Sequence, residues 1–281
     1  IPMSYKNFKL ETCGKPFVAA VAGTCMGGGT ELALACHARV ADEGLKMGLP
    51  EVKVGLFPGA GGTQRVMRMT DGQQGMQFLL QGRTLRAPQA LQMKLVNEVT
   101  GTKQLVGAAK KLLKNGVDPV KDWDKKGYKL PNGKVYSPAG FQFWPAANAI
   151  YRRETYDNYP GARYLLSAVV EGLQLPMDLA LQVESRYFAK VLQTPEAANM
   201  IRSLFVSMQE LNKLARRPAD QRPNKIRKIG ILGAGFMGAG IAYVSANAGI
   251  DVVLIDRDQE AADKGKAHSE ELISKAVKMG R

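Results

Sequence analysis

Two glutamates, Glu31 and Glu51, each lie beside a glycine-rich turn, and this pattern could carry out chemistry. Glu31 follows a glycine triplet at 27–29, and Glu51 precedes a second glycine-rich run that begins at Gly55. Glycine lets a backbone pass close to a ligand with its N–H groups turned outward, and such groups can hold an oxyanion. Two carboxylates can divide acid and base roles, so the pattern predicts addition of water across an activated double bond. Either glutamate alone is typical of a surface or capping residue.

Short strands and helices are expected to hold these residues. An apolar run over residues 15–22 predicts a buried strand that ends before the glycine triplet, and good helix formers over 30–36 follow it. Glu31 then falls in the first helical turn, where the helix dipole favours a carboxylate. Short strands are expected at 38–41 and 45–47, and the second glycine run opens a second helix. We expect the two turns to frame one site.

A second glycine motif, Gly233-x-Gly235-x-x-Gly238, enclosing Phe236 and Met237, lies between an expected strand at 228–232 and an expected helix at 239–248. A further strand at 251–255 ends at Asp256. This spacing is typical of a dinucleotide site, in which the glycines admit the pyrophosphate and the acidic residue accepts from the ribose hydroxyls. The motif therefore predicts NAD as the cofactor, with FAD or a degenerate site as the alternatives.

Composition and charge narrow the class of protein. The 281 residues carry a formal net charge of +14, concentrated at 103–134 and 213–228. Solvated loops and linkers explain this charge best, an anionic small molecule is the alternative, and no aromatic-interleaved motif favours nucleic acid. The three cysteines have no C-x-x-C spacing, so we expect no metal site, no disulfide framework and a cytoplasmic location. We also expect no transmembrane segment, because the apolar runs are short.

The remaining pattern predicts an α/β chain of two domains with a helical connector. Helices are expected at 74–81 and 87–94, a strand at 95–99, and three helices over 161–172, 177–191 and 195–214. Two expected strands at the end are fewer than the roughly six of a full dinucleotide-binding fold. The expected divisions are 1–115, a partial catalytic domain; 116–160, a basic loop rich in Pro and Gly; 161–216, the connector; 217–224, a linker; and 225–281, the start of a dinucleotide-binding domain.

The first glycine turns resemble the signature of the enoyl-CoA hydratase, or crotonase, family. The similarity extends through the triplet and Glu31, then Leu49-Pro50-Glu51, and then a run from Gly55 to Arg65. It implies the C-terminal part of a crotonase-like ββα superhelix. It also implies that Gly28 N–H is an oxyanion donor, that Glu31 and Glu51 are the acid and base, and that Gly59 N–H holds the water. The family's other oxyanion donor would lie upstream of the first residue.

The second motif resembles the start of 3-hydroxyacyl-CoA dehydrogenase, whose catalytic His and Glu would lie downstream of Arg281. The two parts together resemble the α-subunit family of bacterial fatty-acid β-oxidation complexes, as do connector residues 184–188 and 201–205. This resemblance implies acyl-CoA substrates, hydration of a 2-enoyl-CoA followed by NAD-dependent oxidation, and a thiolase β subunit as partner. A non-catalytic scaffold, an enoyl-CoA isomerase and another CoA reaction are the alternatives.

Overall fold

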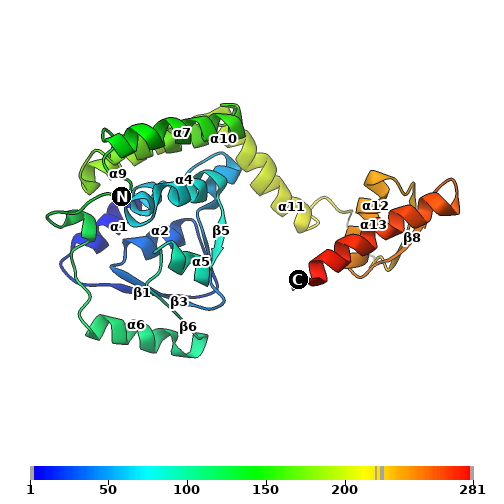
Figure 1. Cartoon of the computed structure of the whole chain (residues 1–281), viewed down its shortest axis with the longest axis horizontal. Coiled ribbons are helices and arrows are strands. Elements are labelled where there is room, and N and C mark those ends of the chain that lie inside the picture. The colour runs from blue at the N-terminus through cyan, green and yellow to red at the C-terminus, as the bar shows by residue number, and fades with distance from the viewer. Residues whose placement is uncertain (1–2, 219, 222–224, 279–281) are drawn as a thin grey trace. The chain divides into compact units, whose positions relative to one another are not determined.

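The computed structural model describes residues 3–218, 220–221 and 225–278 (Figure 1). The chain divides into two compact units, Ile1–Ala215 and Arg216–Arg281, and each is described by itself. Part of the expected linker 217–224, namely residues 219 and 222–224, lies outside the described residues. Residues 1–2 and 279–281, at the ends of the first and last expected domains, also lie outside them.

The first unit holds two small sheets. The first has the order β1-β3-β6 with parallel pairs, and the second has the order β2-β4-β5, in which β2 and β4 are parallel and β5 is antiparallel. The strands are β1 (Val18–Val21), β2 (Thr24–Met26), β3 (Ala38–Asp42), β4 (Lys46–Gly48), β5 (Thr84–Arg86) and β6 (Glu98–Thr100). The strand expected at 15–22 is thus shorter, and the strand expected at 95–99 begins only at Glu98.

Helices make up most of the rest of the first unit (Figure 1). They are α1 (Met3–Thr12), α2 (Gly28–Ala35), α3 (Gly62–Met69), α4 (Gly72–Gln81), α5 (Ala87–Gln92), α6 (Leu105–Lys114), α7 (Pro138–Thr155), α8 (Pro160–Gly172), α9 (Met177–Leu192), α10 (Pro195–Met200) and α11 (Met208–Asn212). Helices α4 and α10 each start at a side-chain cap: the side chain of Asp71 accepts from the N–H groups of Gln73 and Gln74 at α4, and Thr194 accepts from Ala197 N–H at α10. The helix expected over 195–214 is interrupted by a π-helical segment, Ile201–Ser207.

Two helices replace segments that we expected to be loops. The basic stretch 103–134 contains α6, whose Leu105 and Ala109 pack on Val40 of β3. The segment 116–160 contains α7, which starts at the cap Ser137 and continues through Pro145. We predicted loops because the first segment is rich in lysine and the second contains prolines. Both segments also have apolar residues at helical spacing, and a helix forms when this apolar face can be buried against the rest of the fold.

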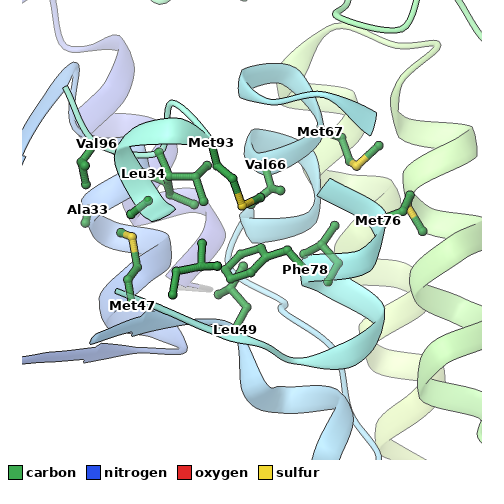
Figure 2. Close-up of a cluster of buried hydrophobic side chains, with 14 of the residues drawn as sticks. Ala33, Leu34, Met47, Leu49, Val66, Met67, Met76, Phe78, Met93 and Val96 are labelled. Carbon is green, nitrogen blue, oxygen red and sulfur yellow. The ribbon is translucent and has the colours of Figure 1, made fainter. Parts of the chain in front are cut away.

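A continuous apolar core lies between α2, α3, α4, α5 and the strand β4, as Figure 2 shows. Leu34, Met47 and Leu49 have no exposed surface, and the nearly fully buried Phe78 of α4 belongs to the same cluster. This core fixes α2 and α3 against each other. Their N-terminal ends, which carry the two glycine turns, are therefore held in place by burial rather than by the turns alone.

The second unit is a single βαβ unit followed by a helix. It consists of β7 (Lys228–Leu232), α12 (Phe236–Asn247), β8 (Asp251–Ile255) and α13 (Gln259–Lys278), and β7 pairs with β8 in parallel. Both strands have the bounds expected from the sequence, and α12 begins three residues earlier than expected, within the glycine motif. The order strand, glycine turn, helix, strand is the one that a dinucleotide site requires.

Candidate active site

The first glycine turn brings the N-terminus of α2 to the surface. Gly27 has φ +56°, a conformation that L side chains rarely adopt, and its N–H donates to Gly48 O on β4 at 2.9 Å. The exposed Gly28 is the first residue of α2, so its N–H has no acceptor within the helix. An exposed N–H at a helix N-terminus, where the dipole is positive, suits the oxygen of a polarised carbonyl.

Glu31 connects this turn to the second one. Its side chain is buried, and its Oε1 accepts from Ala60 N–H at 2.7 Å and from Gly62 N–H at 2.8 Å. Burial raises the pKa of Glu31, while these two N–H donors and the positive charge of Arg65 act in the opposite direction. Neither N–H bond involves Oε2, so that oxygen can accept from a water molecule or a ligand.

Glu51 lies against the first turn, in a short 3₁₀ helix over Pro50–Val54. A Cβ added at Gly27 would lie 3.0 Å from Glu51 Oε1, so the carboxylate sits directly on the glycine backbone next to Gly28. Its Oε2 is buried and has no hydrogen-bond partner within the described residues. Burial and the charge of Glu31 raise the pKa of Glu51 to about 7. A carboxyl with such a pKa is suited to both giving and taking a proton near neutral pH.

Gly59 lies in the second turn, and its backbone is in close contact with α9. A Cβ at Gly59 would be 2.6 Å from Cδ2 of Phe188, and the ring of Phe188 meets Phe57 edge to face at 5.6 Å. Gly59 therefore lies in the same glycine turn as Ala60 and Gly62, whose N–H groups donate to Glu31. Its role in holding water stays a prediction.

A buried ion pair between Arg65 and Glu11 supports the second turn. Arg65 donates to Glu11 of α1 at 2.8 Å, and both side chains are fully buried. Arg65 Nη1 and Asn7 Nδ2 also donate to Ala60 O, at 3.2 and 3.0 Å. Glu11 was not predicted to belong to this region, because no local motif relates it to Arg65, which lies 54 residues further on.

Glu184 of α9 is a third carboxylate at the second turn that we had noted only as part of the connector. It is fully buried and accepts from Gly61 N–H at 2.6 Å and from Thr63 N–H at 3.2 Å. Glu184 is flanked by Ala180, Leu181 and Val183, which are all buried. A charged glutamate among apolar residues on one helical face is unusual, and this pattern could have indicated a functional or structural role for Glu184.

The second glycine motif has the geometry of a dinucleotide-binding turn. Gly233 has φ +94°, and a Cβ at Gly238 would lie 1.7 Å from Gly233 O, so the close approach of β7 and α12 requires glycine there. A Cβ at Gly235 would meet nothing within 4 Å, which leaves open space where a pyrophosphate would lie. Phe236 and Met237, which begin α12, are largely exposed.

Asp256 lies at the end of β8, beside the turn. Its Oδ2 accepts from Ala234 N–H at 2.5 Å and its Oδ1 from Arg257 N–H at 2.7 Å, and these two bonds lower its pKa. A cavity of about 470 Å³ is lined by Gly235, Phe236 and Asp256. Each carboxylate oxygen can accept a second hydrogen bond, so the residues present fit the ribose and pyrophosphate of NAD.

Two domain families match different parts of the chain. Residues 4–122 match the family "Enoyl-CoA hydratase/isomerase", and residues 228–281 match "3-hydroxyacyl-CoA dehydrogenase, NAD binding domain". The "Fatty acid oxidation complex subunit alpha" of Idiomarina loihiensis is 36% identical over 96% of this chain. The protein of the same name from Psychrobacter cryohalolentis is 33% identical over 95%.

This chain is a homologue of the fatty acid oxidation complex α subunit. It spans 38% and 37% of the lengths of these two relatives. The solved structure of EchA1_1 from Mycobacterium paratuberculosis is 30% identical, with a TM-score of 0.45, over 68% of this chain and 60% of that one. The expected fold class is confirmed: a crotonase-like domain precedes the start of a dehydrogenase NAD-binding domain. None of the helices in the described part of this α-subunit homologue is long and apolar enough to span a membrane.

Proposed function

We propose that the first unit is the hydration site of a fatty-acid β-oxidation enzyme, which converts a 2-enoyl-CoA to a 3-hydroxyacyl-CoA. One observation carries the proposal: Glu31 is buried, the half-buried Glu51 lies on the backbone of Gly27 next to the exposed Gly28, and the charge of Glu31 acts on Glu51. Two carboxyls next to an oxyanion donor are what addition of water to a thioester-activated double bond requires. The family match of residues 4–122 supports it.

In this mechanism the thioester oxygen accepts from Gly28 N–H, which stabilises the enolate that forms when water adds. The free oxygens, Oε2 of Glu31 and of Glu51, hold the water, with Gly59 N–H as a further contact. One carboxyl removes a proton from the water as its oxygen bonds to C3 of the acyl chain. The other delivers a proton to C2, so the enolate collapses to the 3-hydroxyacyl-CoA. The raised pKa of Glu51, about 7, allows it to serve in either role.

We propose further that the second unit binds NAD and that the whole protein oxidises the 3-hydroxyacyl-CoA to a 3-oxoacyl-CoA. Gly233, Gly235 and Gly238 would cradle the pyrophosphate, and Asp256 would bind the ribose hydroxyls. NAD supplies the hydride acceptor when bound. The names of the relatives, subunit α of a complex, support a partner subunit, which we propose is a thiolase, and the cysteine pattern supports a cytoplasmic location.

The hydration proposal is tested by the loss of enoyl-thioester absorbance when the 281-residue protein is mixed with crotonyl-CoA. Glu31→Gln and Glu51→Gln should each lower kcat/KM by about 10³-fold or more, because each removes a group that transfers a proton. The exposed Glu43 is the matched control, and Glu43→Gln should leave the rate unchanged. Full activity in both site variants would contradict the proposal.

The products distinguish the alternative activities. Formation of 3-hydroxybutyryl-CoA supports hydration, whereas conversion of a 3-enoyl-CoA to a 2-enoyl-CoA without water addition supports isomerisation. Binding of crotonyl-CoA without any reaction would favour the scaffold alternative.

A further inference from the structure

The second glycine turn is held between two carboxylates that come from distant parts of the chain. Four successive N–H groups alternate between them: Ala60 and Gly62 donate to Glu31 of α2, whereas Gly61 and Thr63 donate to Glu184 of α9. The hydroxyl of Thr63 makes a further contact with Glu184 Oε2. The two carboxyls therefore bind opposite sides of the same turn and of the N-terminus of α3.

This turn has a conformation that needs support. Gly61 has φ +100°, and a Cβ there would lie 1.8 Å from Nη1 of Arg65. The carbonyl of Ala60 is fixed by Asn7 and Arg65, and the N–H groups of the turn are held by the two carboxylates. Buried N–H groups without an acceptor are costly, so loss of Glu184 would force Gly61 and Thr63 to seek other partners.

We propose that Glu184 is a positioning residue: it holds Gly61 and Thr63 so that Ala60 and Gly62 can bind Glu31, and it thereby sets the position of the Glu31 carboxylate. This inference rests on the proposed hydration function. Phe188, one helical turn further along α9, contacts the same segment at Gly59. The α9 helix, part of the expected connector, thus packs against the hydration site and supports its second turn.

The charged groups around Glu184 are consistent with this arrangement. They are Glu31 from α2 and Arg65 from α3, and Arg65 is paired with Glu11 of α1. Burial, and then the charge of Glu31, raise the pKa of Glu184 to about 8, while Thr63, Gly61 and Arg65 act in the opposite direction. The charge of one carboxyl thus favours the neutral form of the other.

The test uses the backbone amide signals of the turn in the full ¹⁵N-labelled chain, followed by NMR from pH 5 to 9. In Glu184→Gln, the signals of Gly61 and Thr63 should lose the titration step near pH 8. The signals of Ala60 and Gly62 should also move toward weaker hydrogen bonding, and their hydrogen exchange should become about tenfold faster. Unchanged Ala60 and Gly62 signals, with only Gly61 and Thr63 affected, would overturn the proposal.

Glu171→Gln is the matched control. Glu171 of α8 is a more exposed carboxylate that accepts from Arg186 and from the hydroxyl of Tyr187, which both belong to α9 and not to the turn. This variant should leave all four amide signals unchanged. If Glu184→Gln does not fold, Thr63→Val and Thr63→Ser replace it, because only serine keeps the hydroxyl that contacts Glu184. Identical Ala60 and Gly62 signals in these two variants would then overturn the proposal.

Hydration kinetics give the functional readout. Glu184→Gln should lower kcat by about tenfold or more and leave KM within about twofold, because a misplaced Glu31 affects the chemical step more than substrate binding. Unchanged kcat would count against the positioning role. If the unmodified chain hydrates no enoyl-CoA, the proposed function fails, and the amide signals still decide whether Glu184 positions Glu31.

Discussion

At the scale of single residues, Glu51 shows how burial prepares a group for chemistry. One of its oxygens lies on the backbone of Gly27, and Oε2 is buried without a partner within the described residues. An unpaired buried acceptor costs free energy unless a ligand or water molecule satisfies it. Since the Glu31 charge adds to the effect of burial, the carboxyl of Glu51 binds its proton more tightly than an exposed glutamate does.

This proton affinity predicts how stability changes with pH. The pKa of Glu51 rises from 4.5 to about 7 on folding, so the folded state binds the proton more tightly than the unfolded chain. The resulting stabilisation is fully present below pH 4.5 and is lost as the pH rises through about 7. Glu51→Gln lacks this contribution, so between pH 5 and 8 the unmodified protein should lose about 2.5 kcal/mol more unfolding free energy than the variant.

Urea unfolding followed by tryptophan fluorescence measures this difference. Trp123 and Trp144 both belong to the first unit, so the signal reports the unit that contains Glu51. Glu43→Gln, which changes an exposed carboxylate, should follow the unmodified protein. Parallel pH curves for the unmodified protein and Glu51→Gln would show that Glu51 has an ordinary proton affinity.

At the scale of elements, the N-terminus of α3 is the point where helices from distant parts of the sequence meet. It receives Glu31 from α2 and Glu184 from α9, and α1 contributes Glu11 through Arg65. A helix N-terminus offers unpaired N–H groups and a positive dipole end, so it stabilises carboxylates. The helices α1, α2 and α9 are thus fixed to the same turn by polar contacts as well as by the apolar core.

The contact between this turn and α9 predicts the effect of Gly59→Ala. The added methyl group would overlap the ring of Phe188, at 2.6 Å, and should destabilise the first unit by roughly 1–3 kcal/mol. Gly107→Ala is the control: a Cβ there meets nothing within 4 Å in α6, so it should be neutral or stabilise by about 0.5–1 kcal/mol.

Urea unfolding of the double variant Gly59→Ala/Phe188→Leu tests the cause of this loss. The smaller leucine gives the methyl group room, so the double variant should lose less free energy than the sum of the two single changes. Strict additivity would indicate that the ring of Phe188 is not what the methyl group meets.

At the scale of the whole molecule, two separate units carry two separate candidate sites. The carboxylate site lies within Ile1–Ala215, and the glycine motif with Asp256 lies within Arg216–Arg281. The hydrogen bonds of Glu31 lie within the first unit, and those of Asp256 lie within the second. The two sites should therefore respond independently to substitution.

Calorimetric titration with NAD tests this independence. Asp256→Asn should weaken NAD binding by about tenfold or more, because it replaces a charged acceptor for the ribose hydroxyls with a neutral one. Asp251→Asn, at the opposite end of β8, should have no effect. Glu31→Gln should also leave NAD binding unchanged. Equal affinity of Asp256→Asn and the unmodified protein would remove Asp256 from the NAD site.

The sequence by itself determined the local units of this protein. Glycine patterns and short apolar runs were sufficient to predict β7, β8 and the helices α2 and α3, because neighbouring residues decide turns and helix starts. Helices α6 and α7 were missed, because lysine, proline and glycine outweighed a helical apolar spacing whose value depends on a surface to pack against.

Only the tertiary structure decided which charges meet. Glu184 lies 123 residues beyond Gly61, and Glu11 lies 54 residues before Arg65, so no local period could relate them. The proton affinities of Glu31, Glu51 and Glu184 likewise depend on burial and on one another, which arise only when the helices pack. The sequence was sufficient to predict the turns and the candidate residues, whereas the ion-pair partners and the pKa shifts depend on the folded structure.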